Sequence, residues 1–565
     1  MLTENEMELR KNDIIETHIE AVSSEGNGIC RAENGEVIFV PNSAVGDTLK
    51  VRIVKKLKKY SFGKIEELIS PSPDRIETDC PCFYQCGGCV YRHISYDAEL
   101  KIKEQRVRDA VERIGKITDV KVDKIVGSEL EERYRNKAQY PVGKNQSGEI
   151  ISGFYGLHSH RIVSCDDCLL QPEIFSQINK TVLDFMKSSK NDVYDETTHK
   201  GKLRHIYLRQ GEKTGEIMVC LVVNGNGLKD EPTLVKELTE KFPQIKSIVV
   251  NSNRDKTNVI LGKRNRVVFG QEYITDQLLG VSFRISPHSF YQVNRRQAEK
   301  LYSIATEYAN LSKEDVLLDL YCGTGTIGLT MSNKVKELVG VEIVEDAIKD
   351  AKINAQINNV ENSRFLCGDA SYAADELKKE GVCPDVVIVD PPRKGCDEKL
   401  LNTIKEMSPK RIVYVSCDPG TLARDLAILK TLGYPPQKIT PVDMFPRTAH
   451  VETVVLLSHK KPDGHINVKV EFGEGEGKVP LDNIAKRAES YKPKERVTYK
   501  MIKEYIEAKY GFKVHTAYIA EVKRDLGLPM YDAPNAVEEL KQPRKHPTAK
   551  KVEAIKDALK HFEII

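Results

Sequence analysis

Four strand–loop–helix units between about residues 291 and 460 constrain the fold of this chain most strongly. They are the segments VLLDLYCGTGTIGLTM, LVGVEIVEDAIKDAKINAQIN, DVVIVDPP and RIVYVSCDPGTLARDLAIL. Each contains a short apolar run without polar alternation, as in strands that are covered on both faces of their sheet. Such units predict a doubly wound, parallel α/β sheet, in which ligands bind where the strands end.

A glycine-rich loop follows the first of these strands, at Gly323, Gly325 and Gly328. Glycines there let the backbone approach a ligand closely, in a context that nicotinamide enzymes and methyltransferases share. Glu342 ends the next strand and could accept hydrogen bonds from a ribose diol. The alternative for Glu342 is an exposed acid without a ligand, so the loop alone indicates a nucleotide-like cofactor and does not name it.

Asp390 ends the third strand and is followed by two prolines that stiffen the loop. Nicotinamide binding does not need this loop. The Asp-Pro-Pro sequence resembles the fourth motif of methyltransferases that use S-adenosylmethionine. A strand-ending turn is the alternative, but the motif favours a methyltransferase over an oxidoreductase.

Two reactive side chains are predicted near the same edge of the sheet. Cys417 follows the fourth strand in Ser-Cys-Asp-Pro-Gly, where a thiolate could attack a bound substrate. Glu452 interrupts the apolar strand TAHVETVVLL, where an ionised carboxylate is costly unless it is partnered or used. The alternatives are a buried structural cysteine and an acid that faces solvent on an edge strand.

Five motifs in order resemble those of the RNA uracil-C5 methyltransferase family, which includes 23S rRNA and tRNA enzymes. They are SFYQVN (289–294), DLYCGTGTIGL (319–329), DPPRKG (390–395), SCDPGTLARD (416–425) and HVETV (450–454). The resemblance covers about residues 12–460 and is closest to the 23S rRNA (uracil-C5)-methyltransferases that contain an iron–sulfur cluster. It implies an enzyme of the EC 2.1.1 class that methylates a specific uridine.

This resemblance also implies a mechanism. The thiolate of Cys417 adds to uracil C6, C5 takes the methyl group from S-adenosylmethionine, and Glu452 removes the C5 proton. A base within folded RNA hides C5 and C6, so the uridine must be flipped out. The resemblance assigns cofactor contacts to Gln292, Tyr321, Glu342 and Asp390.

The rest of the chain divides into three further predicted domains. Residues 12–70 alternate between apolar and polar in short runs, which predicts a small OB-like β-barrel, and this segment resembles a TRAM RNA-binding domain. Seven basic residues and no acidic residue lie between Lys50 and Lys64, a run that suits phosphate contacts or simply a solvated face. Residues 71–290 predict a central α+β domain, 291–460 the Rossmann-like catalytic domain, and 461–565 a mostly helical accessory domain.

Thirteen cysteines in a chain with no membrane-length apolar run and no secretory start favour metal ligands or nucleophiles over disulfides. Sequence spacing predicts a soft-metal site, and the two pairs Cys86/Cys89 and Cys165/Cys168, each separated by two residues, keep zinc open as an alternative. The resemblance implies instead a [4Fe-4S] cluster, whose four ligands are Cys80, Cys86, Cys89 and Cys168.

We therefore expect a cytoplasmic enzyme that acts on RNA, with 23S rRNA as the expected target. We expect no membrane association, and we infer no obligate protein partner. The alternatives are a tRNA uracil-C5 methyltransferase, a catalytically inactive RNA-binding iron–sulfur protein and a Rossmann-type oxidoreductase. The sequence does not identify the uridine.

Overall fold

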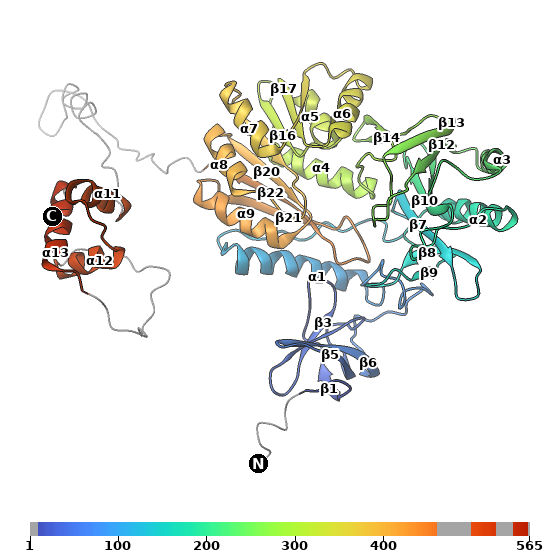
Figure 1. Ribbon diagram of the computed structural model, residues 1–565, viewed down its shortest axis with the longest axis horizontal. Helices are drawn as coiled ribbons and strands as arrows, with labels where there is room; N and C mark the ends of the chain where they lie inside the picture. The colour runs from blue at the N-terminus through green and yellow to red at the C-terminus, as the bar shows by residue number, and fades with distance from the viewer. Residues whose placement is uncertain (1–8, 460–498, 527–545, 563–565) are drawn as a thin grey trace, which may run out of the picture. The chain divides into compact units, whose positions relative to one another are not determined.

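The structure is a computed structural model that describes residues 9–459, 499–526 and 546–562 (Figure 1). The chain divides into two compact units, residues 1–463 and 464–565. The Gly/Glu-rich segment EFGEGEGK and the first part of the predicted C-terminal domain lie outside the described residues. No helix in the described part of the chain is long and apolar enough to span a bilayer.

A six-stranded sheet forms the N-terminal domain. Its strands are β1 (Ile14–His18), β2 (Ala21–Val22), β3 (Gly28–Arg31), β4 (Val37–Val40), β5 (Thr48–Lys56) and β6 (Tyr60–Ser70). They lie in the order β1-β5-β6-β4-β3-β2. Alternate residues of β5 are buried in a core that includes Ile38, Leu49 and Val51, so one face of the sheet is apolar and the other faces solvent. The predicted small β domain is therefore present.

The central sheet combines seven strands with two helices. These elements are β7 (Lys137–Lys144), β8 (Ile150–Tyr155), β9 (Ile162–Ser164), α2 (Glu173–Ser188), β10 (Leu203–Gln210), β11 (Ile217–Val223), α3 (Glu231–Lys241), β12 (Ile245–Ser252) and β13 (Arg264–Gly270). The strand order is β13-β12-β11-β10-β7-β8-β9. Phe175 of α2 and Leu234 of α3 pack into the core of this sheet. A hairpin, β14 (Ile274–Leu278) and β15 (Val281–Ile285), leads to the next domain.

A second seven-stranded sheet carries the predicted catalytic motifs. Its strands are β16 (Val316–Leu320), β17 (Glu337–Glu342), β18 (Ser363–Cys367), β19 (Val386–Val389), β20 (Arg411–Ser416), β21 (Pro436–Val442) and β22 (Glu452–Ser458). The order is β18-β17-β16-β19-β20-β22-β21. The first five strands in this order are parallel, as predicted, whereas β22 runs antiparallel to both of its neighbours.

Helices cover both faces of this sheet, as Figure 1 shows. They are α4 (Arg295–Ala309), α5 (Thr326–Met331), α6 (Glu345–Ile357), α7 (Ala370–Lys379), α8 (Glu398–Met407) and α9 (Pro419–Thr431). Leu317 and Leu338 pack with α4, α5 and α6 on one face, while the adjacent Leu318 and Val339 pack with α7, α8 and α9 on the other. Two apolar cores therefore fix the positions of the strand ends.

One further helix, α1 (Tyr96–Asp109), packs against the same sheet and was not predicted. Ser95 caps its N-terminus by accepting a hydrogen bond from the backbone N–H of Ala98. Val107 belongs to the core that α7, α8 and α9 form. A helix that lies in sequence before the central sheet therefore contributes to the core of the second seven-stranded sheet.

The second unit contains three described helices, α11 (Tyr499–Tyr510), α12 (Thr516–Asp525) and α13 (Ala549–His561). The first two lie where the sequence has helical runs. Ile506, Ile519 and Ile555 are buried together in a small core of their own. The described helices of this unit thus pack around shared apolar side chains.

Candidate active site

The predicted site residues lie around one cavity at the carboxyl edge of the parallel strands. Glu342 is the last residue of β17, whereas Tyr321, Asp390 and Cys417 directly follow β16, β19 and β20. The cavity has a volume of about 830 Å³. Its lining includes all six side chains predicted to act in catalysis or cofactor binding: Gln292, Tyr321, Glu342, Asp390, Cys417 and Glu452.

The glycine loop leaves open space for a ligand. Gly323 has φ +55°, and a Cβ atom added there would meet no heavy atom within 4 Å. Its backbone N–H donates to Glu342 Oε2 (3.1 Å), and the N–H of Val344 donates to Glu342 Oε1 (2.9 Å). The Glu342 carboxylate is therefore held in one orientation beside the open loop.

Gln292 reaches the cavity from the segment before α4. Gln292 is 8% exposed, and its backbone carbonyl oxygen accepts a hydrogen bond from Asn136 Nδ2 (2.9 Å). Asn294, two residues later, caps α4 by accepting from the N–H of Gln297. The SFYQVN motif is thus anchored at Gln292 itself and at Asn294.

Cys417 lies between the end of β20 and the start of α9. Asp418 caps that helix by accepting a hydrogen bond from the N–H of Thr421 (2.9 Å), which fixes the turn. Burial raises the pKa of the Cys417 thiol to about 11, and the charges of Glu452 and Asp390 add to the rise. The side chain of Arg393 opposes these effects. Cys417 is therefore mainly a thiol at neutral pH.

Glu452 is the first residue of β22 and is only 6% exposed. Ser416 pairs with Thr453, so the start of β22 meets the end of β20 and brings Glu452 close to Cys417. Burial, with the nearby charge of Asp390, raises the pKa of Glu452 to about 8. Burial also raises the pKa of Asp390 to about 7. Glu452 thus lies in the interior of the sheet and not at a solvent-facing edge.

The central sheet supplies a wall of the cavity that sequence reasoning missed. Lys137 and Gln139 alternate at the start of β7, and Arg135 precedes the strand by two residues in the same alternation, so the three side chains share one face. Burial and two neighbouring arginines lower the pKa of Lys137 to about 8. The buried Nε of Arg135 has no hydrogen-bond partner among the described residues. Their alternation in YRNKAQ was visible in the sequence, but their position over the cavity depends on packing between domains.

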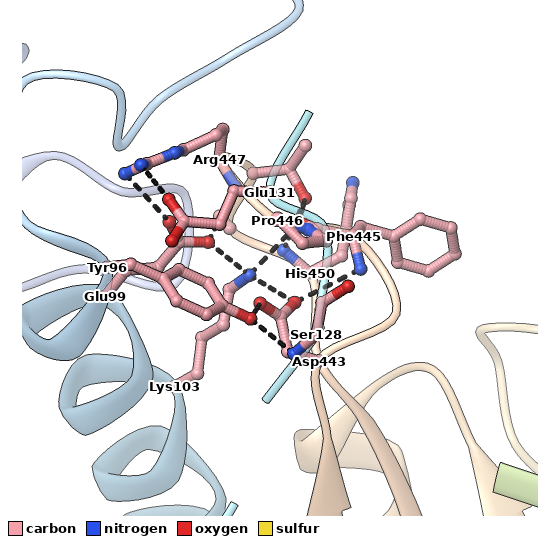
Figure 2. A network of polar contacts seen from close by, with 12 residues as sticks. Tyr96, Glu99, Lys103, Ser128, Glu131, Asp443, Phe445, Pro446, Arg447 and His450 are labelled. Carbon is pink, nitrogen blue, oxygen red and sulfur yellow. Dashed lines mark hydrogen bonds and ion pairs between the residues drawn. The ribbon is translucent and has the colours of Figure 1, made fainter. Parts of the chain in front are cut away.

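A buried polar network holds the loop that precedes β22 (Figure 2). Lys103 of α1 donates from Nζ to Glu99 Oε1 and to Asp443 Oδ1, each at 2.7 Å, and to the carbonyl oxygen of Phe445 at 3.1 Å. The backbone N–H of Arg447 donates to Glu99 Oε1 (2.7 Å). Phe445 also lines the cavity, so α1 helps to position that wall.

Arg447 connects this network to the cysteine-bearing segment. Its carbonyl oxygen accepts hydrogen bonds from the N–H groups of Val90 (2.8 Å) and Tyr91 (3.2 Å), directly after Cys89. Its side chain forms an ion pair with Glu131. The loop before β22 is therefore held from α1 and from the cysteine-bearing segment.

The predicted metal ligands are neighbours in the structure. Burial raises the pKa of Cys86 to about 11 and that of Cys89 to about 12, and the nearby Cys168 adds to both rises. Cys168 also adds to the raised pKa of Cys80. Within the described residues, however, no group of three or more Cys, His, Asp or Glu side chains is arranged to hold a metal ion. The structure does not show a metal site, and the cluster stays a prediction.

Comparison with known proteins identifies the family. Residues 95–460 match the family model described as tRNA (Uracil-5-)-methyltransferase, and residues 9–65 match the TRAM domain. This chain belongs to the tRNA (uracil-5-)-methyltransferase family. It is therefore an RNA methyltransferase of the uracil-C5 type that uses S-adenosylmethionine, with a TRAM domain at its N-terminus.

Relatives of the family are similar in sequence to this chain over most of its length. A protein of Halalkalibacterium halodurans, described as an uncharacterized RNA methyltransferase, is 45% identical over 81% of this chain and 100% of its own length. One from Staphylococcus aureus with the same description is 40% identical over 80% of this chain and 99% of its own. The solved structure of the Pyrococcus abyssi tRNA (uracil-54, C5)-methyltransferase with S-adenosyl-L-homocysteine has a TM-score of 0.62 and 29% identity, and covers 78% of this chain and 100% of that one.

Proposed function

We propose that Cys417 is the nucleophile and Glu452 the proton acceptor in methylation of uracil C5. The observation that supports this most directly is the pairing of Ser416 with Thr453, which brings a thiol and a buried carboxyl group to one cavity. The cavity is also lined by the open glycine loop. A nucleophile, a base and space for a cofactor therefore share one site.

The first step is attack of Cys417 Sγ on uracil C6, after the thiol has lost its proton to solvent. A C6–S bond forms, and the electron pair of the C5=C6 bond makes C5 a nucleophile. S-adenosylmethionine, when bound, would supply the methyl group: the bond between its sulfonium sulfur and the methyl carbon would break as C5 takes the methyl, leaving S-adenosylhomocysteine. Covalent addition thus replaces one difficult substitution by easier steps.

The second step needs a base for the C5 proton. Glu452 accepts this proton, the C5=C6 bond re-forms, and the C6–S bond breaks to release Cys417 as a thiolate. A pKa of about 8 suits this role because a base with a pKa near the working pH both binds and releases a proton readily. The charge of Arg393 favours ionisation of both groups.

The residues around the glycine loop fit the cofactor. We propose that Glu342 accepts hydrogen bonds from its ribose, because two backbone N–H groups hold that carboxylate beside open space. Asp390, whose carboxyl group accepts no hydrogen bond from a described residue, contacts the cofactor with Gln292 and Tyr321. A cation bound next to Asp390 would lower the raised pKa values of Asp390, Glu452 and Cys417.

Trapping of the adduct tests these roles. RNA with 5-fluorouridine at the target should form a stable covalent complex with the wild-type protein, because fluorine cannot leave as a proton does. Cys417→Ala should give no complex, and Glu452→Gln should accumulate a methylated adduct on ordinary RNA. Cys367→Ala is the matched control, since Cys367 ends β18 at the same edge of the sheet. A covalent complex with Cys417→Ala would disprove the assignment.

We propose 23S rRNA in the cytoplasm as the substrate, on the resemblance of the cysteine spacing to that of ribosomal enzymes. The alternative has support in the Pyrococcus abyssi structure, whose protein acts on uracil-54 of tRNA. Incubation of the protein with 23S rRNA and with total tRNA from a strain that lacks the gene would decide. Methyl transfer to tRNA alone would overturn this choice.

We also propose that Cys80, Cys86, Cys89 and Cys168 bind a [4Fe-4S] cluster within the central domain 71–290. Arg92 lies near Cys89 and Arg135 near Cys168, and their charges favour the thiolate forms that a cluster requires. Thiolates around a cluster lie farther apart than the ligands of a single ion, so a cluster is compatible with thiols that do not converge on one point. The helices after residue 460 are proposed to be an accessory domain.

A further inference from the structure

Three aromatic rings are in mutual contact on the outer face of the N-terminal sheet. Phe39 of β4 pairs with Phe62 of β6, and Tyr60 lies two residues before Phe62 on the same face. The ring centroid of Phe39 is 5.4 Å from that of Tyr60 and 5.7 Å from that of Phe62. Ser61 and Gly63, which alternate with these rings along β6, lie on the opposite, buried face of the strand. We name Phe39, Tyr60 and Phe62 the aromatic platform.

The platform is open to solvent. Tyr60 is 37% exposed, and the other two rings are half-buried. The core of this domain consists of other side chains, among them Ile38 and Val51. Pairing of Phe39 with Phe62 across the strands stabilises the sheet, but the three rings remain outside this core and accessible from solvent.

Free positive charge surrounds the platform. Lys55 lies opposite Phe62 on β5, and Lys58 and Lys59 lie in the turn before Tyr60. None of these three lysines forms an ion pair with a carboxylate in the described part of the chain. By contrast, Lys50 pairs with Glu67 on the same strands. The surface thus offers both ring faces and uncompensated cations.

We propose that the aromatic platform stacks nucleobases of a single-stranded segment of the substrate RNA, while Lys55, Lys58 and Lys59 contact its phosphates. Proteins that bind single strands combine these two elements, because phosphates attract the chain and every base has a face that can stack. The proposal rests on the proposed function, in which RNA is the substrate. Stacking tolerates any sequence, so selection of the uridine stays with the cavity.

The absence of tryptophan from the chain makes a direct test possible. Tyr60→Trp in the full-length protein introduces one indole, whose fluorescence should be quenched when a single-stranded oligoribonucleotide is added. Heparin has the charge but no bases, so it should bind without quenching. Phe269→Trp is the matched reporter, because Phe269 is 39% exposed on β13 of another sheet, and its fluorescence should not change.

Binding measurements separate stacking from charge. The double variant Tyr60→Ala/Phe62→Ala should bind the oligoribonucleotide roughly tenfold more weakly, with an unchanged salt dependence. The triple variant Lys55→Ala/Lys58→Ala/Lys59→Ala should reduce the slope of log K against log salt by about 2, at about 0.7 per lost contact. Circular dichroism checks that both variants are folded.

Two results would overturn the proposal. One is RNA binding to the Tyr60→Trp protein with wild-type affinity and no quenching. The other is equal quenching by heparin or by an acidic peptide, which would identify another ligand. Methyl-transfer assays distinguish this failure from failure of the proposed function. The Tyr60→Ala/Phe62→Ala variant should raise KM and keep kcat. An active Cys417→Ala variant would instead refute the proposed chemistry and leave the stacking proposal intact.

Discussion

Lys103 and Asp443 lie 340 positions apart in the sequence, yet Lys103 Nζ is 2.7 Å from Asp443 Oδ1 and both side chains are buried. Glu99 completes the cluster from the same helix as Lys103. This contact connects α1 to the loop that leads into β22. The stability of the loop therefore depends on a charge contributed by a distant part of the chain.

Replacement of Lys103 by methionine should destabilise the protein strongly. It leaves the buried carboxylate of Asp443 without its cation, and leaves Glu99 with only the longer ion pair to Arg447 (3.8 Å), a change that typically costs about 3–5 kcal/mol. Urea unfolding of the full-length protein measures the loss. Lys101→Met is the control, because Lys101 is exposed on the same helix and should cost little. Equal stability of the two variants would show that the buried contact contributes nothing.

The reactivity of Cys417 should depend on Glu452 in a defined pH range. Burial raises the pKa of Cys417 to about 11, and the negative charge of Glu452 adds to this rise. Glu452 carries that charge only as pH exceeds its own pKa of about 8. Glu452→Gln should therefore speed alkylation of Cys417 by iodoacetamide at pH 9 and have little effect at pH 7, as followed by mass spectrometry of the peptide.

Bound cofactor should act on the same thiol through charge. S-adenosylmethionine carries a sulfonium cation that S-adenosylhomocysteine lacks, and a nearby cation lowers the pKa of a thiol. At pH 8, alkylation of Cys417 should be faster with saturating S-adenosylmethionine than with S-adenosylhomocysteine. Equal rates would place the sulfonium too far from Cys417 for methyl transfer to an adjacent carbon.

Substitution at the glycine loop should weaken cofactor binding. Gly323→Ala adds a methyl group that projects into open space beside Glu342, on a backbone with φ +55°. Gly381→Ala is the matched control, since Gly381 also has positive φ and no neighbour within 4 Å but lies after α7, away from the cavity. Both carry similar backbone strain, so calorimetry with S-adenosylhomocysteine should show reduced affinity for Gly323→Ala only.

Iron content should depend on the proposed cluster ligands and not on cysteines outside that set. Anaerobically purified wild-type protein should contain about four iron atoms per chain and absorb visible light, as a [4Fe-4S] cluster does. Cys86→Ser should lower iron and absorbance, and Cys82→Ser should not. Equal iron in both variants, or a colourless protein that contains zinc, would contradict the cluster.

The sequence predicted those residues whose positions follow from strand order. Glu342, Asp390 and Cys417 end parallel strands, and such ends must meet at one edge of a sheet. It did not predict α1, because the buried face of this helix carries Glu99 and Lys103 and so lacks an apolar period. It also missed the wall formed by Arg135, Lys137 and Gln139, whose position depends on packing between the central sheet and the catalytic domain. The local sequence pattern thus predicted the residues at the strand ends. The helix α1 and the wall from the central sheet depend on tertiary packing, which that pattern does not encode.

The register of β22 against β20 restricts how this chain can change in length. Side chains alternate between the two faces of a sheet, so an insertion of one residue between Glu452 and Thr453 would turn the carboxyl group away from Cys417. Extra residues in the loop between β21 and β22 would keep that alignment but would disturb the contacts that Asp443, Phe445 and Arg447 make with α1. We therefore expect the length of the chain to be constant from β21 through the end of β22.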